Sequence, residues 1–425
     1  MAQIKEILVE SNKWWKAPFT IEYKEREIYS QITKFLSLSQ IIALTGLRRV
    51  GKTTLMFKIL QDSIKKGFNP KNIIYFSFDE FRETDIRDIL SEYEKIMKKN
   101  FENEKYLLFL DEIQKLENWE EKLKRIYDTH GKNIKIIISG SESLFIKRKS
   151  KETLAGRIFE FKIEPLSFKE FLGFKEGNFK PIELYEKELS KLFQEYILMQ
   201  GFPELINIKE REIIRKYVKE SIIEKVIYRD IPRLFKIKDV SILESILNII
   251  MEEPGQIIEL SDLAKDLHIS RQTLSTYIRY LEESFLIRKL YNYSRSRRKI
   301  ERKLKKYYPA ILSIDLLSKD DAISQSKAFE GFLVNQLNAE FFWRDPYKNE
   351  VDIISVTQKI IPIEIKYGKI ETKNLLKFMQ KFHINEGYVV SLIQEKKYKV
   401  DGKTVEIVPA YKFLLQKHNL LKIEK

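Results

Sequence analysis

The chain has no cysteine among its 425 residues. Disulfide bonds, zinc sites with thiolate ligands and cysteine nucleophiles are therefore excluded. No apolar run approaches the roughly 20 residues that a membrane-spanning helix requires, and charged residues are mixed into the N-terminal segment MAQIKEILVESNKWW. We therefore expect a cytoplasmic protein with no membrane partner.

Basic residues outnumber acidic ones. Lys and Arg total 77 against 62 Asp and Glu, which gives a formal net charge of +15. This balance favours polyanionic partners, nucleic acid ahead of a membrane surface. The alternative is a Lys/Glu/Ile-rich surface of the thermophile type that is basic without a binding role. Hydrophobic residues make up 43%, enough for folded cores, and the length predicts about two to four domains.

Short apolar runs alternate with amphipathic segments between Ile41 and Glu164. The runs are IIALTG, NIIYFSFD, YLLFLDE, IKIIISGS and IFEFKIEP. Such runs are typical of parallel strands that helices bury on both faces. The pattern then becomes helical from Ser167 to about Asp230, interrupted by GFPE, and resumes a mixed α/β character near the C-terminus.

The first run leads into GLRRVGKTT and then into an amphipathic helix. Strand, glycine-rich loop and helix are the context of a P-loop, in which backbone N–H groups surround phosphate at the positive end of the helix. Lys52 is expected to face the β- and γ-phosphates of ATP, and the Thr53 hydroxyl to bind Mg²⁺. The predicted nucleotide-binding residues are Gly46, Leu47, Arg48, Arg49, Val50, Gly51, Lys52, Thr53 and Thr54.

An acidic pair, Asp111 and Glu112, ends the buried run YLLFLDE. Beside a P-loop, Asp111 is expected to bind Mg²⁺, and Glu112 to orient and deprotonate the attacking water, which predicts hydrolysis rather than binding alone. The alternative is that both acids cap the following helix. The next run ends in a polar cluster from which Ser141 is predicted to face the γ-phosphate. Arg157 is a candidate for stabilising the transition state, in cis or from a neighbouring subunit, or else a surface or salt-bridging arginine.

A helix-turn-helix pattern lies between Leu263 and Leu281, and Ser270 is a suitable N-cap for its second helix. The predicted outer face of that helix carries Arg271, Gln272, Ser275 and Arg279. These side chains suit hydrogen bonds to base edges or phosphates of DNA, although docking of a protein partner is the open alternative. A basic segment follows, with Arg295, Arg297, Arg298, Lys299, Arg302, Lys303, Lys305 and Lys306.

Carboxylates and a lysine recur near the C-terminus. Glu330 lies in a helical pattern, Asp352 in NEVDIIS, and Glu364 and Lys366 two residues apart in IIPIEIKYG. Residues two apart face the same side of a strand, so Glu364 and Lys366 should lie together while Ile363 and Ile365 point into the core. The three acids are predicted metal ligands, with Lys366 as a catalytic residue that orients or activates water. The alternative is a solvated strand face.

The chain resembles the archaeal and bacterial ATPases of the AAA-type P-loop superfamily, whose chains open with a GlRRvGKT loop. The shared motifs are LDEIQ (Leu110 to Gln114), SGSES (Ser139 to Ser143), LAGR (Leu154 to Arg157), PLSFKEF (Pro165 to Phe171), GFPE (Gly201 to Glu204) and YRDI (Tyr228 to Ile231). The resemblance implies a five-stranded ATPase core, a helical lid, a winged helix and, in many members, a nuclease-like C-terminal domain. The acids and lysine near the C-terminus are similar to those of PD-(D/E)xK nucleases, except that Val351 replaces the proline.

The sequence thus predicts a multidomain α/β protein. Its expected parts are a P-loop ATPase core with an N-terminal extension at 1–165, a helical lid at 166–235, a winged helix at 236–295 and a PD-(D/E)xK nuclease-like domain at 296–425. The expected function is ATP hydrolysis with Mg²⁺ that drives or gates action on DNA, with a metal-dependent nuclease domain. The alternative is a nucleotide-controlled switch or scaffold with an inactive nuclease-like domain, whose partners are other proteins or further copies of the chain.

Overall fold

The computed structural model describes residues 2–79, 84–141, 153–235, 237, 239–302 and 304–417. The motif residues Glu142 and Ser143 and the basic residue Lys303 lie outside these ranges. The chain divides into two compact units, residues 1–165 and 166–425. Within the described ranges, no helix has the length and apolar character needed to cross a bilayer.

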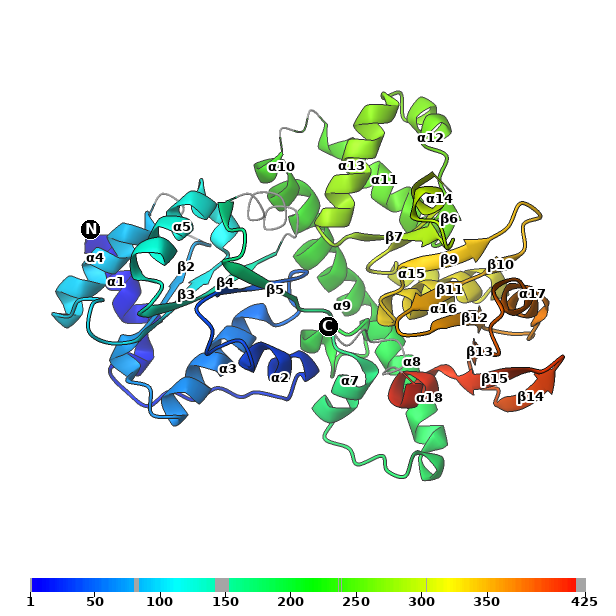
Figure 1. Ribbon diagram of the computed structural model, residues 1–425, viewed down its shortest axis with the longest axis horizontal. Helices are drawn as coiled ribbons and strands as arrows, with labels where there is room; N and C mark the ends of the chain where they lie inside the picture. Colours follow the sequence, from blue (N-terminus) through cyan, green and yellow to red (C-terminus); the bar gives the residue numbers. More distant parts are fainter. Residues whose placement is uncertain are drawn as a thin grey trace. The chain divides into compact units, whose positions relative to one another are not determined.

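Unit 1 is built on a five-stranded sheet in the order β2-β3-β4-β1-β5, and every strand pair in it is parallel (Figure 1). The strands are β1 (Ile41–Thr45), β2 (Ile73–Ser77), β3 (Tyr106–Asp111), β4 (Ile134–Gly140) and β5 (Ile158–Lys162). The five predicted apolar runs are these five strands. Strands β1 to β4 are almost fully buried, as parallel strands between helices must be.

Helices cover both faces of this sheet. They are α1 (Ala2–Ser11), α2 (Glu27–Thr33), α3 (Lys52–Lys65), α4 (Ile86–Met97) and α5 (Trp119–His130). The chain moves from the central β1 to the edge strand β2 and then steps back inward through β3 and β4. Because crossovers are right-handed, this reversal places α3 on one face and α4 and α5 on the other (Figure 1).

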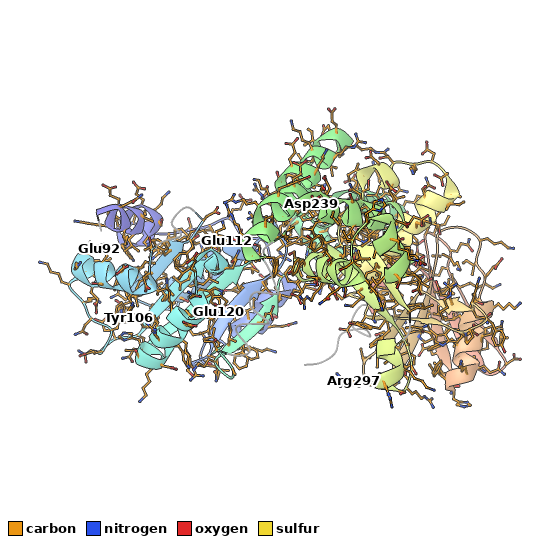
Figure 2. The ribbon with its side chains drawn as sticks, turned by 90° about the horizontal axis from the view of Figure 1, so that it is seen from above. Glu92, Tyr106, Glu112, Glu120, Asp239 and Arg297 are labelled. Atoms are coloured by element: carbon orange, nitrogen blue, oxygen red, sulfur yellow. The ribbon has the colours of Figure 1, made fainter. Side chains whose placement is uncertain are left out.

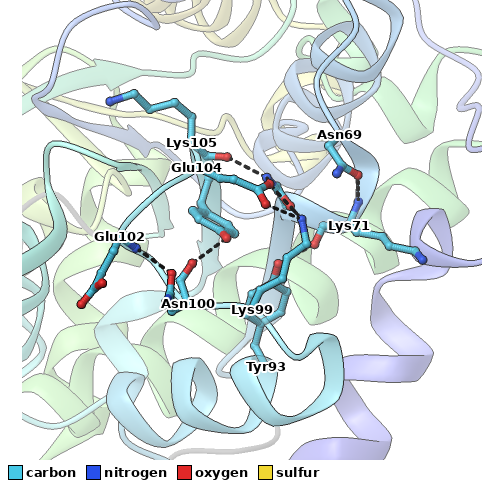
Figure 3. A network of polar contacts seen from close by, with 10 residues as sticks. Asn69, Lys71, Tyr93, Lys99, Asn100, Glu102, Glu104 and Lys105 are labelled. Carbon is cyan, nitrogen blue, oxygen red and sulfur yellow. Dashed lines mark hydrogen bonds and ion pairs between the residues drawn. The ribbon is translucent and has the colours of Figure 1, made fainter.

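The edge of the sheet where β2 and β3 begin is held by a polar network (Figure 3). Lys99 Nζ lies 2.9 Å from Asn72 Oδ1 and 2.8 Å from Glu104 Oε2, and Tyr93 donates to the Lys71 carbonyl at 2.6 Å. These contacts join the loops that precede two neighbouring strands. They lie at the amino ends of the strands and take no part in the loop that follows β1.

Trp14 and Trp15 reach the same edge. Both indole N–H groups donate to the Ile73 carbonyl, at 3.0 and 2.7 Å, and both rings are buried. Because Ile73 is the first residue of β2, the two tryptophans pack the N-terminal extension against the sheet and lie at the end opposite the P-loop.

Unit 2 begins with helices, as predicted for 166–235. They are α7 (Phe168–Phe174), α8 (Glu186–Met199), α9 (Arg211–Lys216), the π-helical turns η6 (Tyr217–Ile223) and η7 (Val226–Asp230), and α10 (Ile231–Leu234). Ser167 and Glu170 form a capping box at the start of α7. Aromatic rings of Phe168, Phe193 and Tyr196 pack between α7 and α8.

Three helices and a sheet follow. The helices are α11 (Val240–Glu252), α12 (Leu260–Asp266) and α13 (Arg271–Glu283), and the sheet has the order β10-β9-β7-β8-β6. Its strands are β6 (Gln256–Ile257), β7 (Ile287–Asn292), β8 (Lys305–Pro309), β9 (Phe341–Arg344) and β10 (Glu350–Val351), with α14 (Arg297–Arg302) between β7 and β8. The predicted boundary between 295 and 296 is wrong as a division of structure, because β7 and β8 pair with each other across it.

A second sheet completes unit 2, in the order β11-β12-β13-β15-β14. Its strands are β11 (Ile353–Val356), β12 (Ile360–Lys366), β13 (Glu386–Ser391), β14 (Lys396–Val400) and β15 (Lys403–Pro409). The neighbouring helices are α15 (Ile314–Leu317), α16 (Ala322–Gln336), α17 (Lys373–Phe382) and α18 (Ala410–Lys412). The predicted mixed α/β character of the C-terminal part is confirmed.

Candidate functional site

The loop between β1 and α3 has the backbone of a P-loop. Gly46 has φ +145°, and a Cβ atom there would lie 2.2 Å from the Ile163 carbonyl oxygen. Gly51 has φ +96° and immediately precedes α3. Both positions therefore require glycine, the first for close backbone approach and the second for a left-handed conformation. The loop presents its N–H groups at the positive end of a 14-residue helix.

Lys52 is folded back onto this loop. Its Nζ donates to the Gly46 carbonyl at 3.0 Å and to the Leu47 carbonyl at 2.8 Å, and the residue is 6% exposed. Backbone carbonyls are neutral acceptors, so a phosphate oxygen competes well for the same ammonium group. The side chain thus lies inside the loop that would surround the phosphates.

Arg26 supports the loop from the N-terminal extension. Its Nη1 donates to the Val50 carbonyl at 2.8 Å and its Nη2 to the Glu164 carbonyl at 2.7 Å. The arginine, 5% exposed, therefore ties the P-loop to the chain that follows β5. Sequence reasoning missed this residue, because a lone arginine 20 residues before the motif carries no local pattern.

Asp111 and Thr53 are brought together at the carboxyl edge of the sheet. The Thr53 hydroxyl donates to Asp111 Oδ2 at 2.8 Å. Tyr75 donates to the same oxygen at 2.9 Å, and Ser139 donates to Oδ1. Burial and the Asp111 charge raise the pKa of Tyr75 well above its ordinary value, so Tyr75 remains a donor. Two oxygen ligands of the kind that Mg²⁺ prefers therefore adjoin the P-loop.

Glu112, labelled in Figure 2, follows β3 in a left-handed conformation, with φ 52°. Its backbone N–H donates to Ser139 Oγ at 3.0 Å. Its Oε2 accepts from Gln114 Nε2 at 2.6 Å, and the same amide donates to Ser141 Oγ at 3.0 Å. Glu112 makes no side-chain cap to the short helix η3 (Ile113–Lys115), so the capping alternative does not describe it.

Gln114 is the last residue of the motif LDEIQ, and no role was assigned to it from the sequence. It links two predicted catalytic residues, Glu112 and Ser141, whose own oxygens lie 3.5 Å apart. Its position one turn after the acidic pair is the signal that sequence analysis had available.

Arg157 lies at the other end of the sheet. Its neighbour Ile158 pairs with Ile41, the first residue of β1, whereas the P-loop follows Thr45. Four strand residues separate the two positions, roughly 13 Å at about 3.3 Å per residue. Arg157 Nε contacts Asp128 Oδ1 at 3.0 Å. The cis role is therefore wrong, the salt-bridging alternative describes the residue, and the trans role stays a prediction.

The predicted outer face of α13 is exposed. Arg271, Gln272, Ser275 and Arg279 are all solvent-exposed, while Leu274 and Ile278 of the same helix are buried. Ser270 Oγ accepts from the Thr273 N–H at 3.0 Å and caps the helix as predicted. A cavity of about 260 Å³ lies between α13 and the β7–β8 hairpin, lined by Leu260, Ser275, Thr276, Ile278, Arg279, Glu282, Lys289, Lys305 and Tyr307.

In unit 2, Glu364 and Lys366 of β12 lie together as predicted, with Lys366 Nζ 2.7 Å from Glu364 Oε1. Asp352 precedes β11 and its Oδ2 accepts the Ile365 N–H at 2.7 Å. Glu364 is 3% and Asp352 8% exposed, so the solvated-face alternative is wrong. Glu364 Oε2 is buried without a hydrogen-bond partner.

Glu330 has different partners. Its Oε1 accepts from the Tyr308 hydroxyl at 2.6 Å and lies 3.3 Å from Lys306 Nζ. Lys306 Nζ also lies 2.5 Å from Glu350 Oε1. Lys306 is 5% exposed. Lys306 belongs to the basic segment that follows the helix-turn-helix pattern, but the alternation of β8 turns it inward, so it does not contribute to a basic surface.

The electrostatics of this carboxylate cluster, defined as Glu330, Glu350, Asp352 and Glu364, follow from burial. Desolvation raises the pKa of Asp352 well above its ordinary value, and the Glu364 and Glu330 charges add to this. Burial likewise raises the pKa of Glu364, against the opposing charge of Lys366. Burial lowers the pKa of Lys306, but the carboxylates outweigh it and the pKa is raised. No group of three or more His, Asp or Glu within the described ranges is arranged to hold a metal ion.

Residues 38–172 match the family model described as an AAA domain, so this segment of the chain is similar to AAA-type ATPase domains. Residues 190–310 and 326–413 match two domains of unknown function, DUF8612 and DUF4143.

The relatives span most of the chain. An uncharacterized protein of Methanocaldococcus jannaschii is 29% identical over 88% of this chain and 85% of its own length. A second from the same organism is 33% identical over 64% of this chain and 62% of its own length. An uncharacterized protein of Haemophilus influenzae is 27% identical over 92% of this chain and 98% of its own length. The likeness therefore extends well beyond the AAA domain.

Proposed function

We propose that the chain binds ATP with Mg²⁺ at the loop from Gly46 to Thr54 and hydrolyses it. The observation that carries this proposal is the 2.8 Å contact between Thr53 Oγ1 and Asp111 Oδ2 beside the P-loop. These two oxygens fit a hard divalent cation. When bound, the ion would neutralise the charge that develops on the phosphates.

The residues have separate roles. Lys52 exchanges the Gly46 and Leu47 carbonyls for the β- and γ-phosphates, and the N–H groups of the loop hold the remaining phosphate oxygens. Glu112 accepts a proton from the attacking water. Its carboxylate is oriented by the Gln114 amide, which also donates to the Ser141 hydroxyl. Water activation is thus assigned to a carboxylate held by its neighbours rather than free to rotate.

Two substitutions test this assignment. Lys52→Ala removes the charge that faces the phosphates, so ATP affinity should fall by about tenfold or more. Glu112→Gln keeps the shape and removes the base, so binding should persist while turnover falls about 100-fold or more. Glu117→Gln, an exposed glutamate shortly after it, is the control and should leave both values unchanged. Full turnover in Glu112→Gln would reject the hydrolytic role.

A second function, binding of DNA, is favoured by the exposed face of α13. Its two arginines, Arg271 and Arg279, project from a capped helix, and Lys289 and Lys305 line the cavity between this helix and the hairpin. We infer that α11 to α13 with β6, β7 and β8 act as a winged helix on DNA, and that ATP hydrolysis drives or gates this action. Docking of a protein on the same face is the alternative.

For the C-terminal sheet, the nuclease-like proposal depends on one divalent ion between Asp352 and Glu364. The unpartnered Glu364 Oε2 supports such an ion. Lys366, 2.7 Å from the other oxygen of Glu364, would orient water beside it. Glu330, the third predicted ligand, is engaged by Lys306 and Tyr308. The scaffold alternative applies if no ion binds.

A further inference from the structure

The Lys306 ammonium group lies among two carboxylates and a phenol oxygen. It stands 2.5 Å from Glu350 Oε1 and 3.3 Å from Glu330 Oε1. It also lies 3.4 Å from the Tyr308 hydroxyl and 5.5 Å from the centre of the Phe342 ring. Two carboxylates from α16 and β10, with a phenol oxygen, thus converge on one buried cation.

The lysine is held there by the fold. β8 pairs with β7 on one side and β6 on the other, so its side-chain alternation is fixed and Lys306 cannot turn outward without a shift of the whole strand. Its side chain is 6% exposed. A buried ammonium of this kind is stable only where carboxylates compensate its lost hydration.

The four carboxylates of the cluster do not have the same number of positively charged neighbours. Lys366 pairs with Glu364 Oε1, and Arg344 Nη1 contacts Glu350 Oε2 at 3.3 Å. Glu364 Oε2, however, has no hydrogen-bond partner and Asp352 is buried beside it. Asp352 and Glu364 are therefore the pair with less positive charge beside them, namely Lys366 alone. Glu330 and Glu350 already contact Lys306, and Glu350 also contacts Arg344.

We propose that Lys306 is a built-in cation that takes the place of a divalent metal between Glu330 and Glu350 and so limits metal binding in this unit to Asp352 and Glu364. Glu330 is then a partner of Lys306 and Tyr308, not a metal ligand. The inference concerns ion binding, and it stands whether or not the unit cuts nucleic acid.

Titration of the full chain with Mn²⁺, without nucleotide, tests the proposal by calorimetry. Lys306→Gln frees two carboxylates, so it should add a binding event or tighten affinity by about tenfold or more, since each added carboxylate strengthens a site for a hard cation. Lys306→Arg keeps the charge and should behave as the unmodified chain does. Unchanged Mn²⁺ binding in a folded Lys306→Gln protein would overturn the proposal.

A matched control exists in the same unit. Lys412 is also 5% exposed, and its Nζ bridges Glu186 and Glu395 at 2.6 Å each. Lys412→Gln removes a buried lysine between two glutamates that are about half exposed and so stay hydrated, and it should therefore leave Mn²⁺ affinity unchanged. An equal gain in Lys412→Gln would mean that the effect is general charge removal and would contradict the proposal.

Glu330→Gln provides the complementary test and does not depend on the lysine variant folding. In the unmodified background it should leave Mn²⁺ affinity unchanged, because Lys306 already engages Glu330. Combined with Lys306→Gln, it should cancel the gain, since neighbouring sites couple. A drop in affinity of about tenfold or more in the single Glu330→Gln variant would show that Glu330 is a ligand and sink the inference.

A thermal scan gives a second readout. Lys306→Gln should lower the melting temperature, because Glu330 loses its counter-charge and Glu350 keeps only the contact with Arg344. Mn²⁺ should then restore more stability to this variant than to the unmodified chain, since a ligand that binds only the folded state stabilises it by mass action. Equal Mn²⁺ stabilisation of both proteins would argue against the proposal.

Discussion

Glu112 shows how a single residue is prepared for chemistry. Its φ of 52° is a left-handed value for a non-glycine residue, which costs of order 1 kcal/mol and persists only when the surroundings enforce it. Here Ser139 accepts its backbone N–H, and Gln114 holds its carboxylate. The conformation turns the carboxylate toward Ser141 instead of along the path of β3.

Gln114→Ala is expected to reduce turnover by about tenfold with little change in ATP affinity. The substitution leaves the carboxylate of Glu112 in place but removes the amide that orients it, and misplacement of a catalytic group costs rate rather than binding. Steady-state hydrolysis and equilibrium nucleotide binding, measured separately, check this. A variant with weakened binding and normal turnover would assign Gln114 to the nucleotide pocket instead.

The residue scale is also where sequence reasoning was least complete. The P-loop, Asp111 and Glu112 were found because their spacing is local. Tyr75 and Arg26 were not, since each joins the site through contacts with elements distant in the chain. Gln114 is only two residues from Glu112 but was given no role. The exposure of Lys306 was predicted wrongly. A run of basic residues suggests a solvated surface, but the pairing of β8 buries this side chain.

At the scale of elements, burial of the strands made the first sheet predictable. The five apolar runs are the five strands. Their spatial order, β2-β3-β4-β1-β5, depends on the crossover connections and cannot be predicted from the residues of any single run. The same limit applied to β9 and β10, which join the sheet of β7 and β8 from beyond α16. The cis role considered for Arg157 would place it near the nucleotide, but this residue precedes its strand whereas the P-loop follows one.

The exposed face of α13 carries the prediction for DNA. Replacing Arg271 and Arg279 by alanine should weaken DNA binding and flatten the slope of log affinity against log salt, by about 0.9 for each phosphate that the protein no longer neutralises. Replacing the exposed Lys187 and Lys191 of α8 changes the net charge equally and is the matched control. Fluorescence anisotropy over a range of salt concentrations measures both.

Two results would contradict the DNA assignment. One is an equal flattening of the slope in the Lys187/Lys191 control, which would attribute binding to net charge alone. The other is a flat salt dependence in the unmodified chain, which would leave the basic balance as surface chemistry and favour protein docking on α13.

At the scale of the whole molecule, the two candidate sites use disjoint parts of the chain. Every residue assigned to the nucleotide site lies between Arg26 and Glu164, within residues 1–165, and the carboxylate cluster lies within 166–425. Their intrinsic activities should therefore be separable by single substitutions, even if hydrolysis gates what the second unit does.

Asp352→Asn tests this separation. It preserves size but replaces a carboxylate ligand by an amide next to the unpartnered Glu364 oxygen, so Mn²⁺ binding in unit 2 and any metal-dependent cleavage of DNA should be abolished, while ATP turnover remains within about twofold. Lys52→Ala should do the reverse, sparing Mn²⁺ binding and removing only the ATP dependence of cleavage. Glu371→Gln, an exposed acid in the same unit, should change neither.

If the unmodified chain binds Mn²⁺ but cuts no single-stranded, duplex or branched DNA, the ion is structural and the nuclease proposal fails. If it binds no Mn²⁺ either, the charge of the cluster is satisfied within the protein. The scaffold alternative then describes unit 2.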